Sequence, residues 1–190
     1  MIFGVLVDRG RTDDDIGAAI RQPVPFSHKH HVGDVGLDCR FCHVTVETQA
    51  SPGMPSAQLC LTCHSQLYAD QPMLAPLRQA VASGQPIGWT HVYRLPDYVY
   101  FDHSVHVAKG VACIECHGRI DQMPLVAKQE SLKMRWCIAC HENPVPHLHR
   151  AGDIYSMAEG RLSESELHGL AQLMRIESRR RLTDCSTCHR

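Results

Sequence analysis

The chain has 190 residues, a length typical of one domain, with 19 basic and 20 acidic side chains. This near-balance, with Arg179, Arg180 and Arg181 as the one basic run, argues against nucleic-acid binding. Only 6% of the residues are aromatic, whereas the chain has 10 cysteines and 14 histidines. The composition therefore indicates a protein whose chemistry depends on thiols and imidazoles.

All ten cysteines fall in five copies of the motif Cys-x-x-Cys-His. The cysteines are Cys39, Cys42, Cys60, Cys63, Cys113, Cys116, Cys137, Cys140, Cys185 and Cys188, and the histidines that follow them are His43, His64, His117, His141 and His189. This is the attachment motif of c-type haem. Two thiols bind the vinyl groups of one porphyrin, while the adjacent imidazole coordinates its iron. The motifs predict five covalently bound haem c groups as cofactors.

Two other uses of cysteine fit this pattern less well. A disulfide framework gives no reason for a histidine after every second cysteine. Structural zinc joins two Cys-x-x-Cys halves around one ion, and five halves cannot be shared evenly among such sites. Haem attachment is therefore the favoured interpretation of all five motifs.

The fold class follows from the number of haems in so short a chain. Five porphyrins in 190 residues must supply much of the core, and glycine and proline occur throughout. We expect a mainly α protein with much irregular coil, a multihaem cytochrome c wrapped around five haems.

An internal duplication indicates how the haems are grouped. The pattern Phe-x-His-x-x-His occurs twice, beginning at Phe26 and at Phe101. The first copy precedes the first and second Cys-x-x-Cys-His motifs, and the second copy precedes the third and fourth. This predicts two duplicated di-haem modules plus a C-terminal haem. The expected boundaries are an N-terminal segment at 1–21, module 1 at 22–70, an extended linker at 71–100, module 2 at 101–149, and an amphipathic helix with the fifth haem site at 150–190.

The remaining histidines are numerous enough to complete the coordination of every iron. In the duplicated pattern, an i,i+3 spacing places both imidazoles on one side of a helical turn, where they can reach two neighbouring haems. The predicted distal ligands are His28, His31, His103, His106 and, for the fifth haem, His147. The alternatives for the fifth ligand are His149, His91, His30, His168, Met157 and Met54.

Prolines and caps predict where helices lie between the motifs. Four prolines between 65 and 100 exclude a long helix there but allow a short one near 73–83, and Pro144 stops any helix begun at Cys137. Ser163 and Glu166 form a capping box that begins an amphipathic helix, which we expect to end near Arg181. The three arginines would then lie at a helix C-terminus or beside haem propionates.

The N-terminus bears on export, because c-type haem is attached outside the cytoplasm. The stretch 1–7 is apolar but is followed at once by Asp8 and Arg9. It is far shorter than the roughly 20 residues of a membrane-spanning helix. We interpret it as the outer end of a signal anchor whose beginning is missing, the alternative being a simple apolar terminus.

The paired-histidine modules resemble class III multihaem cytochromes, the cytochrome c3 and c7 group. The resemblance extends to the pentahaem cytochrome subunit of bacterial alternative complex III through the segments 22–31, 37–43, 95–103, 134–144 and 184–189. It implies partners in a membrane complex: an iron-sulfur subunit, quinone-binding membrane subunits and a mono-haem cytochrome subunit, with a periplasmic electron acceptor. It also implies a location on the periplasmic side of the cytoplasmic membrane.

Electron transfer is favoured over catalysis, and no catalytic residue is expected. Imidazoles suffice for all five irons, whereas a haem enzyme needs an open coordination position. None of the motifs ends in Lys, the variant found at the catalytic haem of multihaem nitrite reductases. A free periplasmic shuttle of the cytochrome c3 type and a multihaem reductase are the alternatives.

Overall fold

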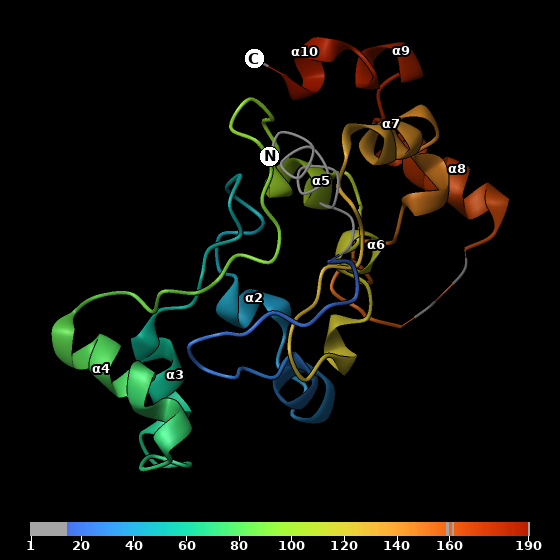
Figure 1. The fold of residues 1–190 in the computed structure, drawn as a ribbon. Coiled ribbons are helices and arrows are strands. Elements are labelled where there is room, and N and C mark those ends of the chain that lie inside the picture. Colours follow the sequence, from blue (N-terminus) through green and yellow to red (C-terminus); the bar gives the residue numbers. More distant parts are fainter. Residues whose placement is uncertain (1–14, 159, 161, 190) are drawn as a thin grey trace, which may run out of the picture.

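The computed structural model describes residues 15–158, 160 and 162–189. Within these residues the chain forms short helices joined by coil (Figure 1), and four isolated bridges take the place of extended strands. In chain order the elements are η1 (Lys29–Asp34), α2 (Cys39–Cys42), α3 (Ala57–His64), η2 (Pro72–Leu74), α4 (Ala75–Ser83), α5 (His103–Ala108), α6 (Ile114–His117), η3 (Ile120–Gln122), α7 (Met134–Glu142), η4 (Val145–His147), α8 (Glu164–Leu173), α9 (Arg179–Leu182) and α10 (Cys185–Cys188). The expectation of a mainly helical chain with much coil is confirmed.

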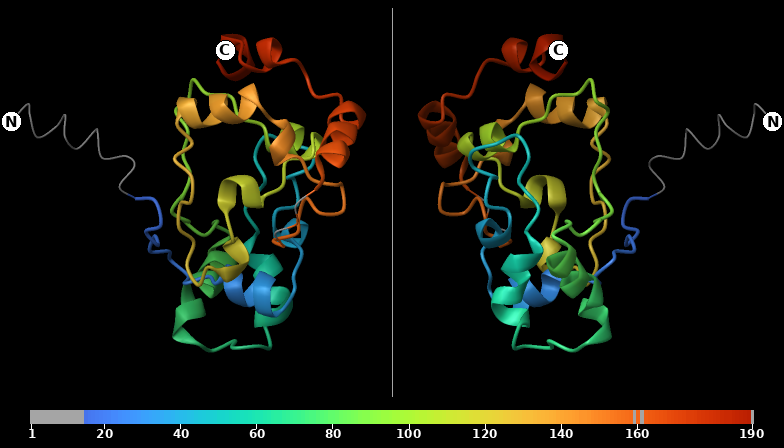
Figure 2. Two further views of the ribbon diagram at one scale, coloured as in Figure 1. Left: turned by 90° about the vertical axis from the view of Figure 1, so that its right-hand side faces the viewer. Right: turned by 90° about the vertical axis from the view of Figure 1, so that its left-hand side faces the viewer.

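The molecule extends from a pair of helices at one end to the C-terminal motif at the other. Helices α3 and α4 form the first end, α2 and α6 lie in the middle, and α7 leads to α9 and α10 at the opposite end (Figures 1 and 2). The elements that carry the motifs are thus spread along the whole length of the fold.

Apolar side chains form one small core cluster, at the end made by α3 and α4. Leu77 is 2% exposed and packs with Ala57, Leu74, Ala80 and Val24. Elsewhere in the described residues the buried hydrophobic side chains are Val46, Ala112, Ala127, Leu148, Ile154 and Met157. This distribution agrees with the prediction that side chains alone do not supply a large core.

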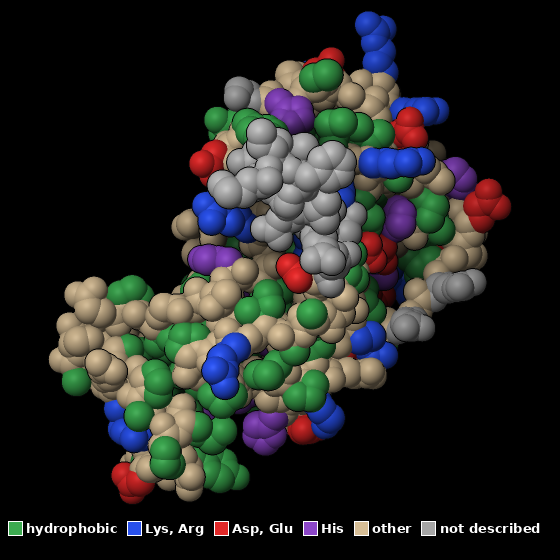
Figure 3. Space-filling view, viewed as in Figure 1, with side chains coloured by type: hydrophobic (Ala, Val, Ile, Leu, Met, Phe, Trp, Pro, Cys, Tyr) green, Lys and Arg blue, Asp and Glu red, His purple; other side chains and the backbone are tan. Residues whose placement is uncertain are grey.

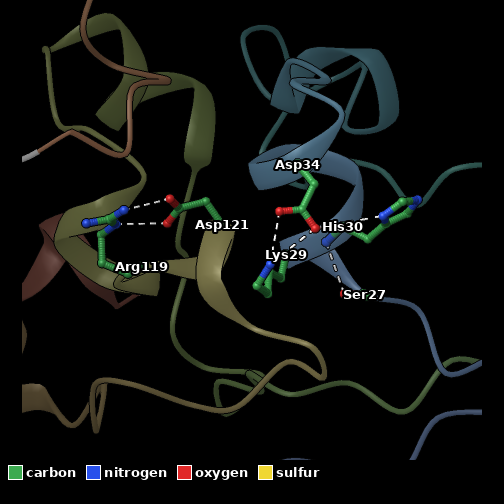
Figure 4. A network of polar contacts seen from close by, with 6 residues as sticks. All are labelled: Ser27, Lys29, His30, Asp34, Arg119 and Asp121. Atoms are coloured by element: carbon green, nitrogen blue, oxygen red, sulfur yellow. Dashed lines mark hydrogen bonds and ion pairs between the residues drawn. The ribbon is translucent and has the colours of Figure 1, made fainter.

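The segment after the third motif packs closely against η1. The Lys29 backbone N–H donates to the Met123 carbonyl at 3.0 Å, and a Cβ at Gly33 would collide with the Asp121 carbonyl oxygen. Ion pairs flank this contact, Lys29 with Asp34 at 2.9 Å and Arg119 with Asp121 at 2.8 Å (Figure 4). Because Gly33 has no side chain, the two backbones can touch, which joins the halves of the duplication.

The short helices begin and end close to the predicted positions, with one exception. Helix α4 lies in the predicted range 73–83, α7 ends before Pro144, and the capping box of Ser163 and Glu166 starts α8. These three predictions are confirmed.

The prediction that the last amphipathic helix continues to Arg181 is wrong. Helix α8 ends at Leu173, and Arg175 adopts a left-handed conformation with φ +50°. The Lys109 ammonium group donates to the carbonyls of Met174 and Arg175, which satisfies acceptors at the helix C-terminus. Ser178 then caps a new helix, α9, so the three arginines begin this helix instead of ending the previous one.

None of the helices in the described ranges is long and apolar enough to cross a bilayer. The predicted remnant of a signal anchor at 1–7 lies outside the described residues.

Candidate haem-binding sites

Each motif lies on a short helical turn, and several of these turns have their own N-cap. The Asp38 carboxylate accepts from the Arg40 N–H, and the Asp184 carboxylate accepts from the Ser186 N–H, while the Ser56 hydroxyl caps α3. A helical turn brings residues i and i+3 to the same side, as two thiols that bind one porphyrin require. The histidine N–H closes the turn onto the first cysteine carbonyl at 2.9 Å in the first, third and fifth motifs.

In the two Phe-x-His-x-x-His segments the phenylalanine ring contacts both histidines in the same way. Phe26 stacks on His31 at 4.4 Å and meets His28 edge-on at 4.9 Å. The second copy repeats this arrangement: Phe101 stacks on His106 at 4.5 Å and meets His103 edge-on at 4.7 Å. The duplication seen in the sequence is therefore also present in the side-chain packing.

Most of the predicted ligands use their Nδ1 atom for a hydrogen bond, which leaves Nε2 free. Among the ten predicted ligands, the acceptors are the backbone carbonyls of Ser27 for His31, Gly53 for His43, Leu67 for His64, Ala50 for His103, Asp102 for His106, Leu182 for His141 and Tyr98 for His189, and the carboxylate of Glu115 for His147. Such a partner fixes the tautomer and orients the ring of a metal-binding histidine. The pattern matches what iron ligation through Nε2 requires.

Within the described part of the chain, His28 and His117 have no such partner for Nδ1, and their pKa values are the most strongly shifted among the imidazoles. Burial, and to a lesser extent neighbouring histidines, lower the pKa of each to about 4. The Nδ1 atom of His28 is buried without a hydrogen-bond partner. Burial therefore keeps both rings neutral at pH 7, the form that binds a metal.

Three pairs of imidazoles face each other at the separation expected across one iron. A bond from a metal to an imidazole nitrogen is about 2 Å long, so two rings on opposite faces of one iron have centres roughly 6 Å apart. The ring centres are 6.1 Å apart for His31 with His64, 6.1 Å for His106 with His141, and 6.5 Å for His103 with His117. Among the histidines, His43 contributes most to the lowered pKa of His28. The residues present thus fit bis-histidine haem.

The thiols of the first three motifs lie next to one another. Burial is the main cause that raises the pKa of the Cys42 thiol, and Cys60 of the second motif is the next. A hydrogen bond between Cys39 and Cys113 lowers the pKa of Cys39 and raises that of Cys113, and it joins the first motif to the third. The second, first and third motifs are therefore consecutive neighbours in space.

The contacts continue through the fourth motif to the fifth. The pKa of Cys116 is raised to about 12, chiefly by burial and then by neighbouring groups that include Cys140 and Cys137 of the fourth motif. The pKa of Cys137 is raised by burial and then by Cys188 of the fifth motif. These electrostatic neighbours, together with the placement of α3, α2, α6, α7 and α10 along the fold (Figure 1), give the order second, first, third, fourth and fifth.

The fifth motif is held by a distant segment of the chain. The Tyr100 N–H donates to the Cys188 carbonyl at 2.8 Å, and the ring centre of Tyr98 lies 5.8 Å from that of His189. His147, the predicted distal ligand, lies beside Glu115, and the described contacts do not join its ring to His189. The assignment of His147 to the fifth haem therefore stays a prediction.

The other candidates for the fifth ligand differ in their surroundings. His149 uses Nε2 for its bond to Glu115, and His168 faces Glu164 on α8. Met157 is buried, whereas Met54 is 54% exposed. Sequence reasoning missed Glu115, although it is the one acidic residue inside a Cys-x-x-Cys-His motif.

Both halves of the chain match models of multihaem cytochrome families. Residues 7–86 match the class III cytochrome c family, and residues 99–190 match cytochrome c7 and related cytochrome c. The motifs, the helical fold and these matches together define a multihaem c-type cytochrome of the c3/c7-like class, an electron-transfer protein that carries covalently bound haem c.

Two characterised proteins are similar to parts of this chain. The multihaem cytochrome c subunit of a menaquinone reductase from Nitratidesulfovibrio vulgaris is 38% identical over 97 residues, which are 50% of this chain and 45% of that protein. The cytochrome subunit of an acrylate reductase from Shewanella woodyi is 26% identical over 112 residues, which are 59% of this chain and 69% of that protein. The chain thus matches less than half of the first relative's length. By their names, both relatives are cytochrome subunits of reductases.

Proposed function

We propose that the chain is the electron-transfer subunit of a membrane quinone oxidoreductase, in which five haem c groups conduct electrons along its length on the periplasmic side. The observation that carries this proposal is the unbroken series of neighbouring motifs, from Cys60 at the second motif to Cys188 at the fifth. This series runs along the elongated fold from α3 to α10 (Figure 1). Electron transfer over such a length requires close neighbours without a gap.

The chain's own residues would attach, orient and insulate each haem. The two cysteines of a motif would hold the porphyrin by thioether bonds, and the motif histidine with its predicted distal partner would bind the iron. Haem supplies an iron that accepts and releases one electron. Histidines locked through Nδ1 keep both ligands in place during this change, so little reorganisation accompanies each transfer.

The ends of the series differ in their surroundings, as sites for two different redox partners would. Hydrophobic side chains gather over the end formed by α3 and α4 (Figure 3), with Leu67 58% and Tyr68 65% exposed beside the second motif. The fifth motif is preceded by the three arginines of α9. We propose that an iron-sulfur subunit contacts one end and a mono-haem cytochrome subunit or periplasmic acceptor the other.

The direction of electron flow separates two forms of this proposal. In alternative complex III, which the sequence resembles, electrons leave quinol and pass to a periplasmic acceptor. In a menaquinone reductase, as the name of the first relative states, quinone is reduced. The similarity to that relative makes quinone reduction the second candidate, with the same haem series conducting in the opposite direction.

Isolation of the native complex from membranes tests the proposal. We expect the chain to co-purify with an iron-sulfur subunit and quinone-binding subunits, and its mass to equal that of the polypeptide plus five haems. All ferric haems should give low-spin spectra. Quantitative release of a monomeric cytochrome by a salt wash would contradict the complex and favour a free shuttle. A high-spin haem that binds nitrite would instead favour a reductase.

The same preparation distinguishes the two directions. Addition of a quinol analogue should reduce the haems if the complex oxidises quinol and passes electrons outward. If the complex reduces quinone, chemically reduced haems should be reoxidised by a quinone analogue, and this reoxidation should exceed the rate of haem reduction by quinol.

A further inference from the structure

We infer that Glu115 is a positioning residue for a haem ligand: its carboxylate holds His147 with Nε2 free to bind iron and holds the neighbouring His149 in the opposite ring orientation. This inference rests on the proposed haem-binding function. It deepens that function by choosing one histidine among the alternatives and by assigning the residue that orients it.

The geometry is a carboxylate shared between two imidazoles. One oxygen, Oε2, lies 2.6 Å from His147 Nδ1, and the other, Oε1, lies 2.9 Å from His149 Nε2. An ionised carboxylate can only accept hydrogen bonds, so each of these ring nitrogens must carry the proton. In the neutral rings the lone pair therefore lies on Nε2 of His147 and on Nδ1 of His149.

The position of the free ring nitrogen makes His147 a better iron ligand than His149. His147 shares the arrangement of His31, His43 and other predicted ligands, in which Nδ1 donates and Nε2 is free. His149 has the reverse arrangement, and its free nitrogen is the one next to Cβ, where the backbone obstructs a porphyrin. The side chain of His149 is also more enclosed, with 17% exposed against 41% for His147.

The surrounding backbone fixes the three residues in place. Glu115 lies on α6 between the two cysteines of the third motif. The segment with both histidines runs beside the residues just before this motif, through a bridge between Val111 and Leu148 and a 2.8 Å hydrogen bond from His149 N–H to the Gly110 carbonyl. The carboxylate thus ties the haem-attachment turn of the third motif to the segment that follows the fourth.

The test uses the purified holoprotein with spectra and redox titration as readouts. We expect Glu115→Ala to retain all five haems by mass, because the thioether bonds do not involve Glu115. One low-spin ferric EPR signal should shift or convert to high spin, and the midpoint potential of one haem should rise, because a carboxylate partner makes an imidazole more electron-donating. Glu115→Gln, which keeps an acceptor for His147 but removes the charge, should keep the low-spin signal and raise the same potential.

Histidine variants and a control identify the ligand. His147→Ala should alter the same EPR signal as Glu115→Ala, whereas His149→Ala should leave all haems low-spin. Glu164→Ala, which removes an exposed carboxylate on α8, should change neither signal nor potential.

Three results would overturn the inference. The first is unchanged EPR spectra and midpoint potentials in both Glu115 variants. The second is an unchanged low-spin EPR signal in His147→Ala, and the third is loss of that signal in His149→Ala. If Glu115→Ala fails to fold, the Glu115→Gln titration alone decides, because no shift in any potential also overturns it. A wild-type protein with fewer than five haems would instead contradict the proposed function, before any variant is examined.

Discussion

The two paired-histidine segments and the C-terminal motif obtain their geometry in different ways. Around Phe26 and around Phe101 each phenylalanine contacts two predicted ligands that lie within five residues of it, and these two contacts agree closely between the copies. The C-terminal motif instead depends on Tyr98 and Tyr100, which are far away in the sequence. Local sequence can therefore specify a distal ligand pair, whereas a single motif must be completed by tertiary contacts.

The largest expected effect comes from removing a motif in the middle of the series, compared with one at its end. Replacing Cys113 and Cys116 by Ala should remove one haem and separate the haems of the first two motifs from those of the last two. Replacing Cys185 and Cys188 by Ala should also remove one haem but leave the other four in contact. Stopped-flow reduction should show slow, biphasic electron equilibration in the first variant alone. Equal kinetics in both variants would contradict the order of the motifs in space.

The contact between the two halves is tested by Gly33→Ala. The added Cβ would collide with the Asp121 carbonyl oxygen, so the backbone of η1 or η3 must move. Overpacking of this kind costs about 1–3 kcal/mol of unfolding free energy. Denaturant unfolding of the holoprotein measures the loss. Gly152→Ala is the matched control, because its Cβ would meet open space, and equal stability of the two variants would argue against the close packing.

The equivalence of the two histidine segments is tested by Phe26→Leu and Phe101→Leu. Each variant loses one stacked and one edge-on ring contact, worth about 0.5–1.5 kcal/mol beyond the area buried. We expect the two losses to agree and each variant to change the spectra of two haems, because each phenylalanine touches two predicted ligands. Thermal unfolding and EPR measure both effects. A change confined to one variant would show that the copies have diverged in function.

The smallest expected effect concerns the capping box of α8, which belongs to the non-duplicated region. Hydrogen bonds from Ser163 and Arg150 lower the pKa of Glu166 from 4.5 to about 2. A carboxyl group with a lowered pKa stabilises the folded state above its unfolded pKa, and this contribution disappears as the pH falls from about 4.5 to about 2.

Circular dichroism should therefore show a small loss of helix over this pH range. In Glu166→Gln the loss should already be present at pH 7 and should not change further with acid. Glu164→Gln, on the same turn, is the control and should lose helix over the same pH range as the wild type. If helix content in Glu166→Gln depends on pH as it does in the wild type, the role given to Glu166 is wrong.

Local patterns in the sequence predicted much of the structure, and long-range contacts account for the rest. The spacing of Ser163 and Glu166 contains all the information for the start of α8, because the capping box is formed within one turn. The end of that helix depends on Lys109, 65 residues before Met174, and no local signal reveals it. The role of Glu115 and the order of the motifs likewise arise only when distant segments meet.

The contact between Cys39 and Cys113 bears on the symmetry of the molecule. These residues are the equivalent first cysteines of the duplicated halves, so the halves meet head to head, as two subunits do across a two-fold axis. Under the proposed function, a four-haem series built in this way is the same when followed from either end. Under the same proposal, the C-terminal motif removes the equivalence of the two ends, and a fifth haem there would give the conductor a distinguishable entrance and exit.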